Sequence, residues 1–126
     1  MSDLLDVGFS WLERQRRRFL SQDVLYRRGA VVVTVPATVG KTTFEVVTAG
    51  GVLERIESRD FLISASDLAV LDPPQRGDRI IEIRGNQTHT YEVLAPGREP
   101  HWRWSDPGHR CLRIHSKYLT TTETAP

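Results

Sequence analysis

Short β-rich segments separated by glycine and proline make up most of this chain, and this pattern restricts the fold more than any other feature. From Asp23 to Tyr118, apolar and polar residues alternate with a period near two, as in strands that have one buried face. Glycine or proline interrupts the alternation often enough to predict six to eight short strands. The expected fold is mainly β, a small antiparallel β-sandwich or barrel with an N-terminal α-helix.

The alternation and its interruptions also predict where the strands begin and end. Pro36 suggests either an edge strand or the end of a strand, and residues 39–43 suggest a turn before the next strand. Residues 64–71 suit a short helical turn, and residues 72–78, which contain two prolines, suit a loop. The expected strands cover residues 24–28, 30–35, 44–48, 52–63, 79–84, 88–94 and 109–118.

An amphipathic helix is expected before the strands, over residues 3–20. Leu5, Leu12 and Phe19 recur at intervals of seven on one side of such a helix. Arginines crowd its last turns, where cations suit the negative end of the helix dipole; a nucleic-acid contact is the alternative role for them. The expected organisation is one domain over residues 1–126, made of this helix, a β domain over 23–118 and a mobile, threonine-rich tail over 119–126.

Length and composition limit the class of protein. The 126 residues suffice for one domain with its own core, and the net charge of +1 announces neither a nucleic-acid partner nor a membrane partner. The single Cys111 excludes an internal disulfide and fits a reducing compartment. The chain has no apolar run of about 20 residues, and its acidic start lacks the features of a signal peptide. We therefore expect a protein that is made and used without the secretion machinery.

The strand pattern also predicts the residues of the core. In the last strand, Leu112, Ile114 and Tyr118 share one parity, which predicts a buried face, and Arg113, His115 and Lys117 share the other, which predicts a basic outer edge. The candidate core residues are Phe61, Leu62, Ile81, Tyr91, Val93, Leu112 and Ile114.

Several short motifs could indicate nucleotide binding, zinc binding or catalysis, but each lacks residues or a neighbouring element that the function requires. Gly40-Lys41-Thr42 resembles the end of a phosphate-binding loop, but the first glycine of that loop is replaced by Val35, and the following residues suggest a strand where the loop needs a helix. His101, His109, Cys111 and His115 do not have the spacing of a structural zinc motif, and a Gly-x-Ser-x-Gly nucleophile motif is absent. We expect no catalytic, cofactor-binding or metal-binding residues, and the residues point to a binding or assembly protein.

Seven stretches, taken in order, resemble the head–tail joining, or head-closure, proteins of tailed bacteriophages and prophages. They are GFSWL (8–12), YRRG (26–29), RDFLI (59–63), PQRGDRI (74–80), YEVL (91–94), WRWSD (102–106) and LRIHSK (112–117). The resemblance implies a small β-barrel or sandwich that joins the portal vertex after DNA packaging. It also implies a ring of six or twelve identical subunits in the virion neck, assembled in the host cytoplasm, without catalytic residues or cofactor. Its partners would be itself, the portal or adaptor protein and the tail terminator or tail tube protein, and DNA would pass through the ring without specific binding.

Aromatic and charged residues in two loops are candidate contacts for such an assembly. Large aromatic side chains and arginine are common interface anchors, although two tryptophans this close together more often serve as core and cover than as contacts. The alternative function is a small nucleic-acid-binding β-barrel that uses Trp102 and Trp104 for stacking; a third is an enzyme that uses Lys41 on a phosphorylated ligand. The candidate interface residues are Pro74, Arg76, Asp78, Trp102, Arg103, Trp104 and Asp106.

Overall fold

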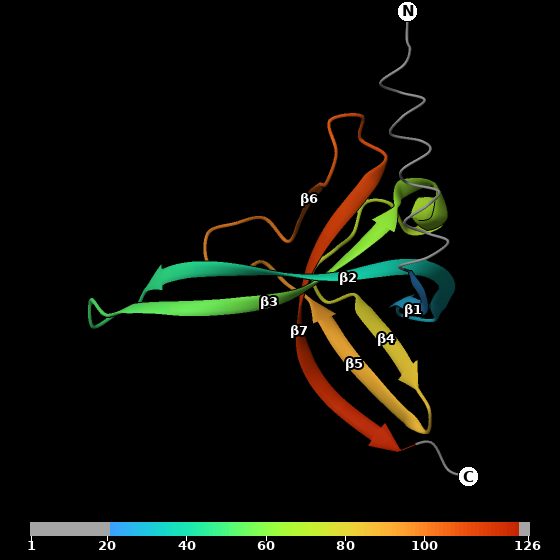
Figure 1. Ribbon diagram of the computed structural model, residues 1–126, viewed down its shortest axis with the longest axis horizontal. Helices are drawn as coiled ribbons and strands as arrows, with labels where there is room; N and C mark the ends of the chain where they lie inside the picture. Colours follow the sequence, from blue (N-terminus) through green and yellow to red (C-terminus); the bar gives the residue numbers. More distant parts are fainter. Residues whose placement is uncertain (1–20, 124–126) are drawn as a thin grey trace, which may run out of the picture.

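The chain folds mainly into antiparallel β-strands, as expected. The computed structural model describes residues 21–123, so the expected helix over residues 3–20 lies outside the described part. One short 3₁₀ helix, η1, interrupts the strands of this part (Figure 1). The elements are β1 (Gln22–Arg28), β2 (Val31–Val47), β3 (Leu53–Ser64), η1 (Ala65–Leu71), β4 (Arg79–Arg84), β5 (Gln87–Val93), β6 (Trp102–Trp104) and β7 (Cys111–Glu123).

The strands pair in a closed cycle. Their order in the sheet is β3-β2-β1-β4-β5-β7-β6, and β3 also pairs with β7. Six strands are therefore linked back to their starting point, while β6 is an additional neighbour of β7. Every pairing is antiparallel. This arrangement brings the second half of β3, Arg59 to Ser64, beside β7.

β2 is a single long strand, which corrects the predicted turn over residues 39–43. Of the two alternatives at Pro36, the edge position is confirmed and the strand end is wrong. Its first half, Val31 to Ala37, pairs with β1, and its second half, Thr38 to Val47, pairs with β3. At Pro36 only one side of β2 is paired, which is the situation in which a strand tolerates proline. Two successive partners therefore keep the strand continuous through residues that sequence reasoning treats as breaks.

The ends of β2 and β3 form a projecting hairpin, which we call the arm (residues 41–57). The β3–β7 pairing begins at Arg59, so within the described chain no third strand pairs with the arm. Figure 1 shows the arm extending away from the other strands along the longest axis of the molecule. It is the part of the fold with the fewest neighbours from its own chain.

The core lies between the strands of the cycle and is closed by η1 at one end. Phe61, Tyr91, Val93, Leu112 and Ile114 are buried there, together with other apolar side chains. Those others include Val24, Tyr26, Val35, Ile63, Leu68, Leu71 and Ile80.

Two predicted core residues are only half-buried. In β4 the inward positions are Ile80 and Glu82, so Ile81 faces the opposite side of the sheet. In β3 the inward positions are Phe61 and Ile63, so Leu62 also faces away from the core. In both strands an unbroken apolar run hid the alternation that decides which side chain points inward.

β7 is longer than the sequence suggested. Residues 119–123, which were predicted to belong to a mobile tail, continue the strand and pair with β5. The register shifts between Thr90 and Tyr91, so Tyr118 lies opposite Tyr91 and is more than half exposed, not part of the buried face. The threonines suit a strand because β-branched residues have high strand propensity.

Candidate functional site

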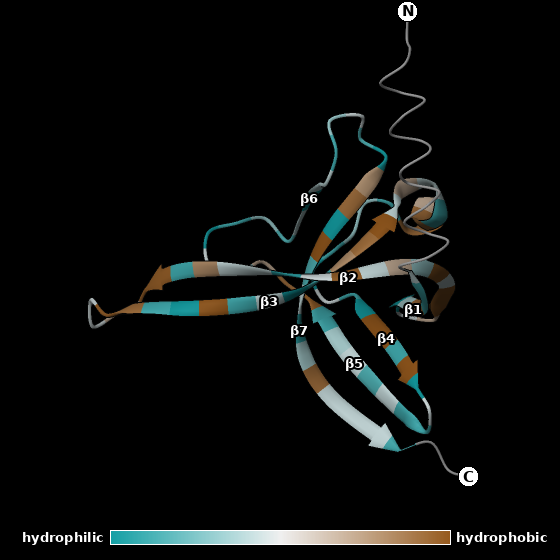
Figure 2. Ribbon diagram, viewed as in Figure 1, coloured by the Kyte–Doolittle hydropathy of each residue, from teal (hydrophilic) through white to brown (hydrophobic). Residues whose placement is uncertain are grey.

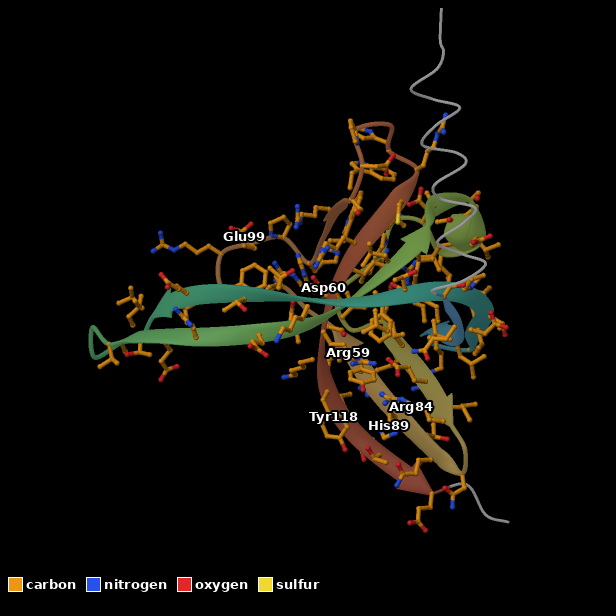
Figure 3. The ribbon with its side chains drawn as sticks, viewed as in Figure 1. Arg59, Asp60, Arg84, His89, Glu99 and Tyr118 are labelled. Atoms are coloured by element: carbon orange, nitrogen blue, oxygen red, sulfur yellow. The ribbon has the colours of Figure 1, made fainter. Side chains whose placement is uncertain are left out.

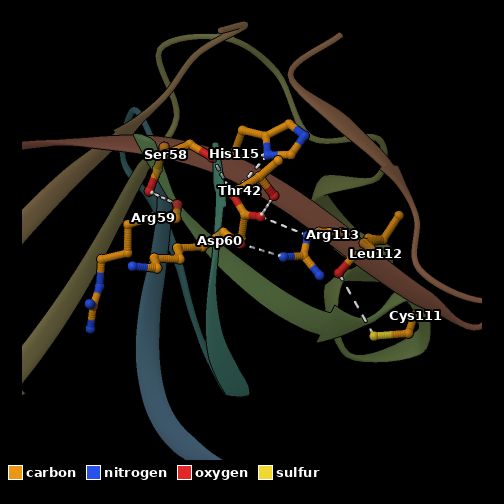
Figure 4. A network of polar contacts seen from close by, with 10 residues as sticks. Thr42, Ser58, Arg59, Asp60, Cys111, Leu112, Arg113 and His115 are labelled. Atoms are coloured by element: carbon orange, nitrogen blue, oxygen red, sulfur yellow. Dashed lines mark hydrogen bonds and ion pairs between the residues drawn. The ribbon is translucent and has the colours of Figure 1, made fainter. Parts of the chain in front are cut away.

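A buried polar centre lies at the base of the arm, where β2, β3 and β7 meet (Figures 3 and 4). Asp60 is fully buried in it. One carboxylate oxygen of Asp60 accepts hydrogen bonds from His115 Nδ1 at 2.8 Å and from Ser58 Oγ at 2.5 Å. The other oxygen accepts from Arg113 Nε at 2.6 Å and from the Thr42 hydroxyl. The carboxylate thus ties all three strands together.

The ionised form of Asp60 is favoured by its partners. Burial alone raises the pKa of this carboxyl, but hydrogen bonds from His115, Ser58, Thr42 and Arg113 outweigh it and hold the pKa well below the usual range. Arg113 forms the ion pair with Asp60, and its Nη2 also donates to the Lys41 carbonyl of β2 at 3.1 Å. A buried charge with this many donors is stable only while the three strands stay in register.

The polar centre does not have the geometry of a catalytic triad. Both Ser58 Oγ, at 3.3 Å, and Asp60 lie at the same ring nitrogen of His115. A triad needs the carboxylate on one imidazole nitrogen and the hydroxyl on the other, so that the ring can accept the hydroxyl proton. The Ser58 hydroxyl instead donates to Asp60. The arrangement therefore holds strands together and does not activate a nucleophile.

His115 was predicted to lie on an exposed basic edge, and this is wrong. Its side chain is buried, and the edge of the Phe44 ring meets it at a centroid distance of 5.2 Å. Leu112 and Ile114 fill the core on the other side of β7, so both faces of this strand are covered. Single-sequence alternation cannot reveal a second covered face when the covering residue comes from the arm.

A second polar cluster fixes the proline loop over residues 72–78. Asp78 is buried and accepts hydrogen bonds from the Tyr26 hydroxyl and from Arg28 Nε at 2.8 Å. Arg28 also donates to the carbonyls of Leu71 and Pro73. Burial and the neighbouring carboxylate raise the pKa of Tyr26. For Asp78, burial raises the pKa, but the hydrogen bonds from Arg28 and Tyr26 outweigh it and lower the pKa.

These contacts change the role of the loop residues that were candidates for an interface. Asp78 points into the protein, so it is not a surface contact, because its charge is used to hold the loop. Pro74 is buried too, and its carbonyl accepts a hydrogen bond from His101 Nε2 at 2.7 Å. Only Arg76 of these three candidates is exposed.

The segment that contains Trp102 and Trp104 mainly covers the core. Trp102 and Trp104 are half-buried, pack against the core and meet edge to face with ring centroids 5.2 Å apart. His109 stacks flat on Trp104, with centroids 4.7 Å apart and an interplanar angle of 3°. Asp106 accepts hydrogen bonds from the backbone amides of Arg110 and Cys111 and so shapes the turn. Arg103 is the exposed member of the candidate set in this segment.

The arm carries exposed apolar side chains that sequence reasoning missed. Val47, Val52 and Leu53 at its tip are 70%, 61% and 60% exposed, and Ile56 is 40% exposed. A groove of about 760 Å³ runs along β2 of the arm and is lined on its other side by Pro96, Gly97, Arg98 and Glu99. The sequence contained one signal for this surface, the apolar residues that flank the Gly50-Gly51 turn, but the predicted break at residues 39–43 concealed the length of the hairpin.

The sequence motif considered for phosphate binding lies within a β-strand. Gly40-Lys41-Thr42 lies in the middle of β2, with Gly40 opposite Asp60, so its backbone is extended and does not form a phosphate-binding turn. Within residues 21–123, no group of three or more potential ligands is placed to hold a metal ion. In the same part of the chain, no helix is long and apolar enough to cross a bilayer.

The fold and its contacts are those of a small β protein whose polar clusters hold strands and loops and whose arm exposes apolar side chains. Comparison with known families agrees with this class. The sequence matches the family described as phage head-tail joining protein over residues 2–123, and the chain belongs to that family. A search of curated proteins found no match. Membership supports a structural role in the phage particle at the junction of head and tail.

Proposed function

We propose that this chain is a structural protein of the phage neck. It forms a homo-oligomeric ring of six or twelve copies at the portal vertex, closes the DNA-filled head and provides the surface on which the tail docks. The family membership carries this proposal, because the match extends over nearly the whole chain. Subunits are made in the host cytoplasm, and DNA passes through the ring without specific binding.

Two features of the structure support this role: the closed cycle of strands and the exposed arm. We infer that the body is a small β-barrel, since six strands pair in a closed cycle and leave few free edges there. The arm has unpaired edges and exposed apolar side chains, as expected of a part that meets other proteins. The portal or adaptor protein on one side and the tail terminator or tail tube protein on the other are the partners in this proposal.

The alternative function, a nucleic-acid-binding barrel, has less support. Stacking of a base requires an open aromatic face, and His109 occupies one face of Trp104. Packing of both tryptophans against the core restricts them further. The two residues on which that alternative depended are thus used inside the protein.

Electron cryo-microscopy of purified virions tests the proposed function. The expected result is a symmetric ring of this chain between portal and tail. A particle that lacks the chain, or that holds scattered copies away from the portal vertex, would contradict the proposal. A monomer in dilute solution decides nothing, because the portal template raises the local concentration of subunits.

A further inference from the structure

A buried carboxylate near the end of β4 holds two arginine side chains. Glu82 is 1% exposed and points inward, in a strand that mixes hydrophobic and hydrophilic residues (Figure 2). Arg59 of β3 contacts both of its oxygens, with Nε donating to Oε1 at 2.8 Å and Nη2 donating to Oε2 at 3.0 Å. Arg84 donates to Oε2 from Nε at 3.1 Å, and its Nη2 lies 2.8 Å from the same oxygen. A single carboxylate therefore holds two guanidinium groups, and one positive charge of this cluster is not compensated.

The two arginines differ from the arginines of the other polar clusters. Arg28 and Arg113 each pair with a buried aspartate and also donate to backbone carbonyls of neighbouring segments. Within residues 21–123, Arg59 and Arg84 have Glu82 as their only hydrogen-bond and ion-pair partner. A guanidinium carries five N–H donors, so each of the two groups has donors left for another acceptor.

Both arginines line the same pocket. The ladder between β1 and β4 contains only Leu25–Arg27 of β1, so the beginning of β1 and the end of β4 are not paired with each other. A pocket of about 460 Å³ lies at this place, beside the point where β2 changes its partner from β1 to β3. None of the described residues that line it is acidic. They are Gln22, Thr38, Val39, Arg59 and Arg84.

The contacts of the guanidinium groups hold them in place before any ligand arrives. Arg59 lies over the ring of Tyr91, with its central carbon 5.0 Å from the ring centroid, and is fixed to Glu82 by two hydrogen bonds. The side chains of Arg59 and Arg84 are nevertheless 31% and 52% exposed, and Figure 3 shows both on the side of β2 where β4 and β5 lie. A ligand in the pocket can therefore reach both groups, and little side-chain freedom is lost when it binds.

We propose that this pocket binds a phosphate group, either free or as part of a phosphodiester. The planar guanidinium group presents parallel N–H donors that match the oxygens of a phosphate, and two such groups beside one pocket provide donors for more than one oxygen. The uncompensated positive charge favours an anion, and the neutral lining offers no carboxylate that would repel it. The proposal concerns the single subunit and does not depend on the ring.

A titration with inorganic phosphate, followed by NMR of the arginine Nε–H signals, tests the site. At constant ionic strength, Arg59 and Arg84 should shift together and saturate, with a dissociation constant of about 1 mM or lower. Arg84→Gln should raise this constant about tenfold, because a charged donor is lost while Arg59 still neutralises Glu82. Arg55→Gln is the matched control, since it removes the same charge from the arm, where Arg55 lies 4.0 Å from Glu45. That control should change the constant by less than about twofold.

Two results of the titration would overturn the proposal. The first is a titration without saturation, or one whose saturation Arg84→Gln leaves unchanged. The second is binding of acetate as tight as that of phosphate, because the pocket would then be a general carboxylate site. Sulfate, which has the same tetrahedral shape, should bind in the same place as phosphate.

Fluorescence anisotropy with a labelled DNA duplex identifies the source of the phosphate group. If the ligand is the DNA backbone, Arg84→Gln should reduce the slope of log affinity against log salt by about one, and Arg55→Gln should not. If Arg84→Gln weakens phosphate binding but leaves the slope unchanged, the pocket takes free phosphate. Both experiments use the isolated chain, so their outcome is independent of whether microscopy finds the ring.

Discussion

Asp60 has four hydrogen-bond donors from three strands around one buried carboxylate. Burying a charge costs several kcal/mol, and only close, well-directed partners offset this cost. Here Arg113 supplies the charge, and His115, Ser58 and Thr42 satisfy the remaining lone pairs. Removing the charge should therefore destabilise the junction of all three strands, β2, β3 and β7.

Replacing Asp60 by Asn should destabilise the protein by about 3 kcal/mol, because Arg113 stays partly buried without its counter-ion. The measurement is urea denaturation at neutral pH. Glu57→Gln is the matched control on the same strand, since Glu57 and Lys41 form an exposed pair at 3.8 Å. That control should cost less than about 1 kcal/mol. Equal effects of the two substitutions would contradict the role given to Asp60.

The contribution of Asp60 to the free energy of unfolding should decrease as the pH is lowered. The pKa of Asp60 is lower in the folded than in the unfolded state, so the folded protein holds its proton less tightly. The stabilisation is complete above the unfolded value of about 3.9 and is lost as the pH falls toward the folded value. The difference in unfolding free energy between the natural protein and Asp60→Asn should therefore shrink below about pH 4. A difference that grows on acidification would refute this assignment.

Asp78 and Arg76 provide a matched pair in the proline loop. Asp78→Ala should cost about 2–3 kcal/mol, because Tyr26 and Arg28 lose a charged hydrogen-bond partner. Arg76→Ala should change stability by less than about 0.5 kcal/mol, because its side chain is exposed. Thermal unfolding of the two variants measures the contrast. Equal melting temperatures would show that the loop is not held through Asp78.

At the scale of elements, the arm is braced by a loop along one of its faces. The loop after β5 approaches β2 so closely that a Cβ atom at Gly97 would lie 2.8 Å from Val46 Cγ1. Gly97 also has a φ of +55°, which favours glycine. The loop, Phe44 and the polar centre together hold one face of the hairpin as far as Val46, while Val47, Val52 and Leu53 remain exposed.

Gly97→Ala should therefore destabilise the fold by about 1–3 kcal/mol through backbone strain together with the clash at Val46. Gly85→Ala is the control, because Gly85 has a similar φ of +60° but open space around its Cβ position. The larger loss of unfolding free energy should occur at Gly97. Adding Val46→Ala to Gly97→Ala should recover the part due to the clash. No recovery would mean that backbone strain alone explains the effect.

At the scale of the whole molecule, pairings between distant segments dominate. The β3–β7 pairing joins residues 47 to 57 positions apart, for example Asp60 and His115, and it completes the cycle of strands. The body is closed by this pairing, and the arm is the part that remains open to other molecules.

DNA binding should be weak and strongly dependent on salt. In the proposed ring DNA must leave through the channel, and with a net charge of +1 we expect a dissociation constant above about 1 μM at physiological salt. Fluorescence anisotropy with a labelled duplex measures the affinity and its salt dependence. Trp104→Phe should leave both unchanged, because His109 stacks on this ring, whereas Arg103→Ala should reduce the salt dependence. Nanomolar binding that Trp104→Phe abolishes would favour the nucleic-acid alternative.

The sequence by itself determined the strand-rich class, the family resemblance and much of the core. Alternation predicted Leu112 and Ile114 inside because it is a local property of a strand, and the apolar run at residues 61–63 predicted a buried Phe61. The motif arguments also needed only local context, as at Gly40-Lys41-Thr42, where a strand occupies the place of the required helix.

Tertiary structure decided what depends on neighbours from distant parts of the chain. β1 and β3 carry β2 through Pro36, and Phe44 from the arm covers the side of β7 that holds His115. The role of Asp78 came from Tyr26 and Arg28, some fifty residues earlier. Local patterns cannot show which distant segment covers a face or pairs with an edge, because burial and hydrogen bonding are completed only when the strands meet.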